Sequence, residues 1–191
     1  MRTPPSSPPS PAESTPSLAR AFRERPITTF LATGFGSGLS PVAPGTAGSA
    51  VALALAWGAV ALFHPGHGPS IAAAVGLLAS GLLTFAAGVP ITTRASRAMG
   101  AKDTGAIVLD EFAGQFLASA AVPLFSYASA PRAAIAWIGS FLAFRIFDVW
   151  KPGPIRRIQD LPDGLGIMID DVLAGLLAAG VTVLLAGALG P

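Results

Sequence analysis

Residues 166–187 read GIMIDDVLAGLLAAGVTVLLAG, and from Val172 onward this stretch carries no charge. An apolar run of this length can cross the roughly 30 Å hydrocarbon core of a bilayer as one helix. Yet Asp170 and Asp171 lie side by side at its start, where a carboxylate facing hydrocarbon costs about 2.5–3.5 kcal/mol. The stretch therefore predicts a membrane helix that begins at a polar site.

The composition of the whole chain agrees with a membrane location. Hydrophobic residues make up 52% of the 191 residues and charged residues 12%, with a mean hydropathy of +0.63. A soluble domain carries about 25% charged residues, so the chain is expected to be an integral membrane protein. The formal net charge of +2 is too small for a nucleic-acid-binding surface. The lack of cysteine excludes disulfides, thiolate metal sites and cysteine nucleophiles.

Pro and Ser dominate the N-terminal stretch MRTPPSSPPSPAESTPSLA, which cannot bury a core. Residues 1–25 are expected to form a disordered tail that ends in a basic collar of Arg20, Arg23 and Arg25, and residues 26–191 to form one helical membrane domain. The apolar segments of that domain cover residues 47–63, 71–89, 106–126, 133–150 and 167–189. The expected fold is all-α, a multi-span bundle of four to five transmembrane helices.

The basic residues are distributed unequally among the connections between these segments. They precede the first segment and lie between the second and third and between the fourth and fifth, whereas the other loops hold Arg132 and two histidines. Because cytoplasmic loops are enriched in Lys and Arg, this pattern predicts a cytoplasmic N-terminus and an outer C-terminus. The acidic residues from Asp103 onward, eight of the ten in the chain, all fall on the cytoplasmic side of this topology.

Three of the predicted helices carry acidic residues near the same end. Asp110 and Glu111 open the third segment, Asp148 ends the fourth, and Asp170 and Asp171 open the fifth. The helix dipole stabilises such residues by under about 1 kcal/mol, which is less than their cost in hydrocarbon. Carboxylates from three helices at one depth can hold a hard cation such as Mg²⁺. The alternative is solubilising charge at the interface, or salt bridges between helices.

A loop and a basic group predict a phosphate site on the same side. The stretch GFGSGLSPVAPGTAGS, residues 34–49, can turn tightly and places Gly45 and Thr46 at the start of the first span, where free N–H groups favour a phosphate. A simple connecting loop is the alternative. Arg145 and Lys151 lie at the end of the fourth segment and can bind phosphate oxygens.

Two other groups have weaker claims to a function. Arg156 and Arg157 also follow the fourth segment, where they either bind a phosphate or belong to the basic residues that orient the chain in the membrane. His64 and His67 lie at the opposite end from every carboxylate of the site, so we expect a loop role for both.

The stretches GFGSGLSPVAPGTAGS, IVLDEFAGQ and FRIFDVWKPGPIRRIQDLPDGLGIMIDDVLAG resemble, in this order, the bacterial phosphatidylglycerophosphatase A family. The resemblance implies an all-helical, Mg²⁺-dependent phosphatase of the bacterial cytoplasmic (inner) membrane that converts phosphatidylglycerophosphate to phosphatidylglycerol. The family motifs carry over to Pro44, Gly45, Thr46, Asp103, Asp110, Glu111, Arg145, Asp148, Lys151, Pro152, Gly166, Asp170 and Asp171. Where the family often has Asp-Pro, this chain has Asp103 and Thr104, which weakens the assignment of Asp103.

The residues and the resemblance together predict hydrolysis of a phosphomonoester on a lipid at the cytoplasmic face. The expected Mg²⁺ ligands are Asp110, Glu111, Asp170 and Asp171, with Asp148 contributing to catalysis. Arg145 and Lys151 are expected to stabilise charge on the transferring phosphoryl group, and Gly45 and Thr46 to bind it as well. Direct attack by water and an aspartyl-phosphate intermediate are equally compatible with these residues.

Three other classes of protein are weighed against this prediction. A CDP-alcohol phosphotransferase would show Asp-Gly followed after two residues by Ala-Arg, and the sequence after Asp163 and Gly164 lacks that pattern. A cation-coupled transporter would carry acids near the bilayer midplane, and a structural scaffold would not explain the clustered acids. The expected partners are the lipid substrate and the membrane, without nucleic acid, and the sequence indicates no protein partner.

Overall fold

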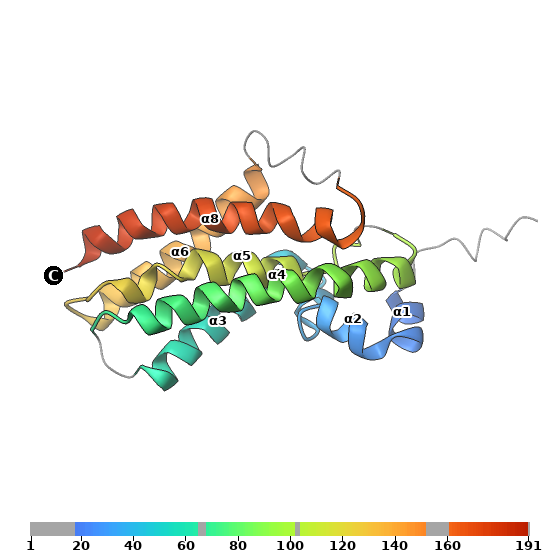
Figure 1. The fold of residues 1–191 in the computed structure, drawn as a ribbon, viewed down its shortest axis with the longest axis horizontal. Coiled ribbons are helices and arrows are strands. Elements are labelled where there is room, and N and C mark those ends of the chain that lie inside the picture. Colours follow the sequence, from blue (N-terminus) through green and yellow to red (C-terminus); the bar gives the residue numbers. More distant parts are fainter. Residues whose placement is uncertain (1–17, 65–67, 102–103, 152–160, 191) are drawn as a thin grey trace, which may run out of the picture.

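The computed structural model describes residues 18–64, 68–101, 104–151 and 161–190, which fold as helices without a strand. The helices are α1 (Leu18–Glu24), α2 (Pro26–Ala32), the 3-10 turn η1 (Ser37–Leu39), α3 (Pro44–Phe63), α4 (Ile71–Met99), α5 (Leu109–Ser119), the 3-10 turn η2 (Val122–Leu124), α6 (Ala130–Trp150) and α8 (Asp163–Leu189). Figure 1 shows α3, α4, α5, α6 and α8 gathered into one elongated bundle, with α1 and α2 at one end. The predicted all-α class is confirmed.

Within the part of the chain that the structure describes, four helices are long and apolar enough to cross a membrane: α3, α4, α6 and α8. Their outward faces carry large apolar side chains, as Leu62, Leu83 and Leu184 illustrate with exposed fractions of 73%, 69% and 75%. A water-facing helix would place polar residues on this side, so these faces suit hydrocarbon. The protein is a multi-pass membrane protein.

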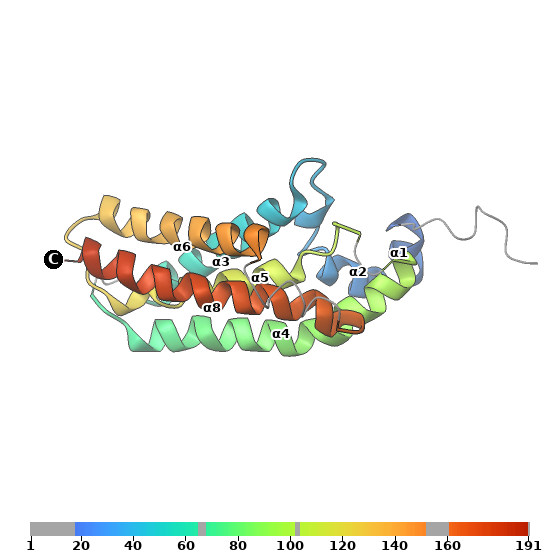
Figure 2. The same cartoon turned by 90° about the horizontal axis from the view of Figure 1, so that it is seen from above.

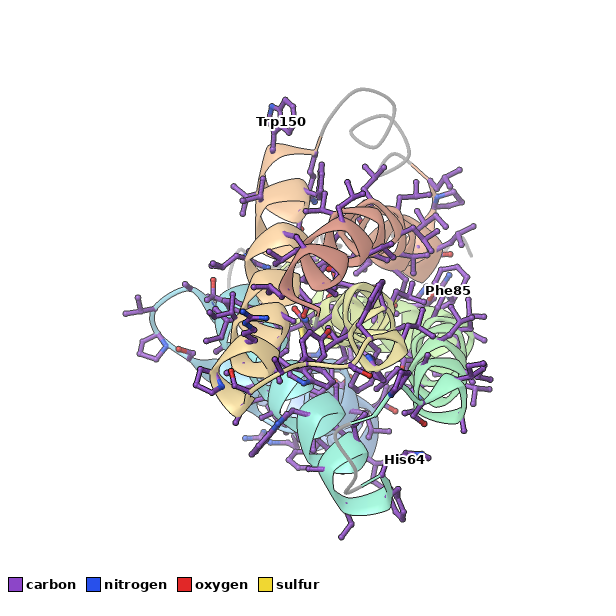
Figure 3. The ribbon with its side chains drawn as sticks, turned by 90° about the vertical axis from the view of Figure 1, so that its left-hand side faces the viewer. His64, Phe85 and Trp150 are labelled. Atoms are coloured by element: carbon purple, nitrogen blue, oxygen red, sulfur yellow. The ribbon has the colours of Figure 1, made fainter. Side chains whose placement is uncertain are left out.

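The third apolar segment folds differently from the span expected over residues 106–126. Its helix, α5, has 11 residues and rises about 16 Å, short of the roughly 30 Å that a span requires. Eight of those residues are buried, because α3, α4, α6 and α8 all pack against α5. Figure 3, which looks along the bundle, shows α5 surrounded by these four helices. Phe112 and Leu117 join Met168 and Val172 of α8 in the largest apolar cluster.

The second span continues well beyond its apolar part. The predicted segment ends at Val89, but α4 runs on to Met99, and its 29 residues rise about 44 Å. The extension carries Arg94 and Arg97, and α1 and α2 pack against it through a small cluster of alanines and Met99. Two residues of the basic collar, Arg20 and Arg23, lie in α1, and Arg25 follows it. Residues 1–17 of the predicted disordered tail lie outside the described residues.

The start of α8 is fixed against this extension of α4. Arg97 Nη2 lies 2.8 Å from Asp163 Oδ2, and the backbone N–H of Gly164 donates to Thr93 Oγ1 at 2.8 Å. Seen from above in Figure 2, α8 lies between α4 and α6. This position brings the first turns of α8 beside the first turn of α5.

Candidate active site

The first turn of α5 and the third turn of α8 bring three carboxylates together. Oxygen atoms of Asp110, Glu111 and Asp171 lie within 4.8 Å of one another. Asp171 is 2% exposed. One oxygen of each carboxylate, Asp110 Oδ1, Glu111 Oε2 and Asp171 Oδ2, is buried without a hydrogen-bond partner among the described residues. Buried oxygens of this kind are rare unless an ion or water satisfies them.

Two glycines allow α5 and α8 to approach closely enough for this cluster to form. Gly114 lies one turn after Asp110, and Gly175 lies one turn after Asp171. A Cβ atom at Gly175 would lie 2.4 Å from the Gly114 carbonyl oxygen, and one at Gly114 would lie 2.6 Å from the Asp171 carbonyl oxygen. The two backbones are therefore in direct contact one turn away from the carboxylates.

The fourth carboxylate belongs to an ion pair within α6, and the arginine of that pair also hydrogen-bonds to α3. Arg145 Nη1 lies 2.5 Å from Asp148 Oδ2 and donates to Ser49 Oγ at 3.3 Å. Ser49 is itself fixed, because its hydroxyl donates to the Gly45 carbonyl at 2.9 Å. A Cβ atom at Gly45 would come within 2.2 Å of Glu111 Oε1. The start of α3 thus lies directly against the carboxylate cluster.

The start of α3 offers backbone donors at the same place. Ala43 adopts a left-handed conformation with φ of 47°, and Pro44 then occupies the first helical position. The N–H groups in the first turn of a helix lack partners within the helix, so those of Gly45 and Thr46 can receive an anion. Thr46 is half-buried here.

Lys151 and Asp170 form a second ion pair at the edge of the cluster. Lys151, whose φ of 45° ends α6 in a left-handed turn, places its Nζ 2.5 Å from Asp170 Oδ2. The Asp170 side chain is 5% exposed and that of Lys151 25%. The adjacent acids of α8 therefore differ: Asp171 faces α5, whereas Asp170 is neutralised by the end of α6.

The carboxyls of α5 hold protons tightly. Burial, followed by the charge of Glu111, raises the pKa of Asp110 well above its ordinary value. Burial raises the pKa of Glu111 to about 8, and the charges of Asp171 and Asp148 add to this despite an opposing hydrogen bond with Asp110. Burial lowers the pKa of Lys151, but its hydrogen bond to Asp170 and the nearby acids raise it overall. Negative charge on α5 therefore requires a proton or a cation to offset it.

The predicted site residues meet at one end of the bundle. Asp110, Glu111, Asp171, Asp148, Asp170, Arg145, Lys151 and Gly45 belong to the contacts above, with Thr46 next in sequence. Salt bridges between helices, the alternative interpretation of the acids, account for Asp148 and Asp170 but leave the cluster of three unexplained. Asp103, Asp160, Arg156, Arg157 and His67 lie outside the described residues. His64 hydrogen-bonds to Ser70 Oγ at 3.2 Å, at the other end of α3.

Two residues that position the site, Ser49 and Gly114, were missed by the sequence interpretation, and Gly175 was expected only as a small residue suited to close helix packing. Ser49 sits one turn after Gly45, which is a signal the sequence does contain. Gly114 and Gly175 each follow an acid by four residues, and this spacing places them on the same helix face as that acid. A search for small residues one turn from each acidic doublet would have found both.

Known proteins share this arrangement of sequence. A family profile described as phosphatidylglycerophosphatase A matches residues 30–186. The chain is 37% identical over 153 residues to phosphatidylglycerophosphatase A of Escherichia coli K12, which covers 79% of this chain and 78% of that protein. It is 41% identical over 150 residues to the protein of the same name from Haemophilus influenzae, with coverage of 78% and 82%.

A third relative carries a different name. A Bacteroides thetaiotaomicron protein, provisionally named phosphatidylinositol-3-phosphatase, is 35% identical over 150 residues, 78% of this chain and 87% of that protein. No solved structure gives a significant match. The matched region of the family profile includes every site residue from Gly45 to Asp171.

Proposed function

This chain belongs to the phosphatidylglycerophosphatase A family, and on that basis we propose that it hydrolyses phosphatidylglycerophosphate to phosphatidylglycerol and phosphate. The observation that carries the proposal is the cluster of Asp110 and Glu111, which are half-buried, with the buried Asp171, beside two ion-paired cations. A metal-assisted phosphatase needs carboxylates for a cation and positive charge for the phosphoryl oxygens. The carboxylates and the two cations lie at the same end of the helical bundle.

We propose Mg²⁺ as the cofactor, held by Asp110, Glu111 and Asp171. The donors fit, since Mg²⁺ prefers carboxylate oxygens and each of these residues has a buried oxygen without a hydrogen-bond partner among the described residues. When bound, Mg²⁺ would neutralise phosphoryl oxygens and lower the pKa of a coordinated water. Asp170, the fourth ligand that the sequence predicts, pairs its Oδ2 with Lys151 Nζ at 2.5 Å, and its role toward the cation stays a prediction.

The remaining residues supply binding and charge stabilisation. Arg145 can offer donors to the phosphoryl group while Asp148 and Ser49 fix its position. Lys151 is held beside the cluster by Asp170 and adds a compact positive charge. The N–H groups of Gly45 and Thr46 complete the phosphate site from the α3 side.

The activity is tested by phosphate release from phosphatidylglycerophosphate by the purified protein in detergent, with Mg²⁺ or EDTA. We expect release that depends on Mg²⁺ and is lost in a folded Asp171→Asn variant. Release that persists in EDTA would rule out the cation while keeping the substrate. The Bacteroides relative makes phosphatidylinositol 3-phosphate the comparison substrate, and its faster hydrolysis would replace phosphatidylglycerophosphate in the proposal.

We further propose that the site faces the cytoplasm in the bacterial inner membrane. The support is the concentration of basic residues at this end of the bundle, including Arg94, Arg97, Arg145 and Lys151. The chain has no cysteine, so single cysteines at Arg94 and Ala128 report the two ends of the bundle. In intact spheroplasts, a membrane-impermeant maleimide should label the cysteine at position 128 and spare that at position 94. The reverse labelling would invert the topology.

A further inference from the structure

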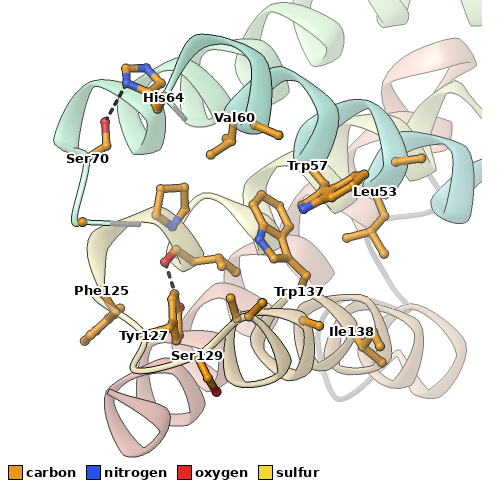
Figure 4. Close-up of a pocket in the computed structure, with 18 of the residues that line it drawn as sticks. Leu53, Trp57, Val60, His64, Ser70, Phe125, Tyr127, Ser129, Trp137 and Ile138 are labelled. Atoms are coloured by element: carbon orange, nitrogen blue, oxygen red, sulfur yellow. Dashed lines mark hydrogen bonds between the residues drawn. The ribbon is translucent and has the colours of Figure 1, made fainter. Parts of the chain in front are cut away.

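A groove of about 740 Å³ lies between α3 and α6, away from the carboxylates. Figure 4 shows Trp57 of α3 beside Trp137 of α6, with Phe125 and Tyr127 toward one end of the groove and Leu53 and Ile138 toward the other. Alanines line much of both walls, among them Ala54 on α3 and Ala134 on α6. Their short side chains leave space between the two helices, and Trp57 in the lining is 57% exposed.

The lining of the groove extends along both helices toward the end of the bundle that holds Arg145 and Ser49. The hydrogen bond from Arg145 to Ser49 joins α6 to α3 at that end. The groove begins one residue further along α3, at Ala50, and continues past Leu53 and Trp57 with the spacing of a single helix face. On α6 the lining includes Ile138, about two turns before Arg145.

The length and polarity of the groove match one lipid chain. From Ala50 to Val60, α3 rises about 15 Å, which is half of the roughly 30 Å hydrocarbon core of a bilayer. None of its described lining residues is Lys or Arg, and the polar side chains at the end far from Arg145 are His64, Ser70, Tyr127 and Ser129. A molecule with an anionic head at Arg145 and an apolar tail would match the charge at both places.

We propose that this groove binds one acyl chain of the lipid whose phosphate is removed at the carboxylate cluster. The inference rests on the proposed function and adds a specificity site to it. The chain enters between α3 and α6 beside the Arg145–Ser49 contact and lies against Trp57 and Trp137. The groove therefore makes the enzyme prefer long acyl chains over short ones.

Filling the groove tests this preference. In Ala54→Phe and Ala134→Phe, the added ring occupies the space of the acyl chain, and the matched control is Ala79→Phe at an exposed position of α4. The measurement is kcat/KM for dipalmitoyl and dihexanoyl phosphatidylglycerophosphate at fixed mole fraction in mixed micelles. Both groove variants should lower the long-to-short ratio at least about tenfold, the effect of losing the burial of about two methylene groups. A ratio equal to that of the control would overturn the proposal.

The short-chain substrate separates this proposal from the proposed function. Hydrolysis of the dihexanoyl lipid by every variant, with an unchanged long-to-short ratio, would reject the groove and keep the phosphatase. A wild type that hydrolyses neither lipid would reject the phosphatase instead.

A photocrosslinking measurement on the wild-type protein tests whether the acyl chain lies in the groove, so the proposal stays testable even if a variant misfolds. Wild-type protein is irradiated with phosphatidylglycerol that carries a diazirine in one acyl chain, and crosslinked peptides are located by mass spectrometry. Adducts within 50–61 and 130–138 that excess phosphatidylglycerophosphate prevents support the proposal. Adducts elsewhere would overturn the proposal. Adducts in the groove that the substrate does not compete away would assign the groove to another lipid of the bilayer.

Discussion

The contact between Gly114 and Gly175 makes the separation of α5 and α8 a direct determinant of catalysis. In Gly175→Ala, the new Cβ atom would lie 2.4 Å from the Gly114 carbonyl oxygen and 2.8 Å from its Cα, whereas ordinary contact begins at 3.4 Å. Both opposing atoms belong to the backbone, so no side chain can rotate away. The helices must part by about 1 Å, and overpacking of this kind costs about 1–3 kcal/mol of stability.

That separation would move Asp171 away from Asp110 and Glu111. A misplacement of about 1 Å lowers the rate of an enzyme by about a hundredfold, so we expect Gly175→Ala to reduce phosphate release by about that factor and to require more Mg²⁺. Gly114→Ala should act in the same direction, since its Cβ would lie 2.6 Å from the Asp171 carbonyl oxygen. The assay is phosphate release against Mg²⁺ concentration, with thermal unfolding in the same detergent.

Gly180→Ala is the matched control on the same helix. A Cβ atom there meets nothing within 4 Å, and alanine favours a helix over glycine by about 0.5–1 kcal/mol. This control should keep full activity and unfold at the same or a higher temperature. Wild-type activity in Gly175→Ala would refute the link between helix separation and the proposed cation site. Equal losses of activity in Gly175→Ala and in the control Gly180→Ala would show that the loss does not depend on the contact between Gly114 and Gly175.

Three further predictions concern the charged groups. Asp171→Asn should lower phosphate release and Mg²⁺ affinity by more than about a hundredfold, because loss of a residue that merely hydrogen-bonds to a metal ligand already costs up to that factor. Titration calorimetry with Mg²⁺ measures the binding, and an unchanged affinity would remove Asp171 from the ligand set. Lys151→Met should destabilise the protein by about 3–5 kcal/mol, because it leaves the buried Asp170 carboxylate without its cation. Adding Asp170→Asn should recover part of the lost thermal stability, and no recovery in the double variant would contradict this prediction. The pKa values of Asp110 and Glu111 are raised, to about 8 for Glu111, so Mg²⁺ must displace protons below that pH. Its affinity should therefore fall as the pH drops from 8 to 6, and binding should release protons. Calorimetry in two buffers of different ionisation enthalpy would detect the released protons, and a pH-independent affinity would argue against this prediction.

The sequence predicted those parts of the fold that depend on local apolar length. The apolar segments that became α3, α4, α6 and α8 end at the predicted residues or within a few turns of them, because the bilayer requires about 20 apolar residues of each span. Residues 106–126 were different, since the burial of α5 depends on four neighbouring helices. Its apolar composition suits either lipid or a protein interior, so composition alone could not separate the two.

The chemistry of the site was also more predictable than its geometry. Asp110, Glu111 and Asp171 follow from the recurrence of acids at matching helix ends. Which member of the α8 doublet faces α5 depends on the rotation of α8, and the Gly114–Gly175 contact determines that rotation. The pairing of Asp170 with Lys151 depends in turn on the left-handed turn that ends α6, and nothing in the local sequence specifies that contact.

The burial of α5 also has a consequence for biosynthesis. A helix of 11 residues with two acids in its first turn cannot remain across a bilayer by itself, and the neighbour that it contacts most, α8, follows it in the chain only after α6. The nascent chain therefore holds α5 without its principal neighbour until α6 and α8 have been synthesised. Insertion of α8 then shelters α5 and brings Asp170 and Asp171 to it, so a chain that stops before α8 lacks the proposed metal site.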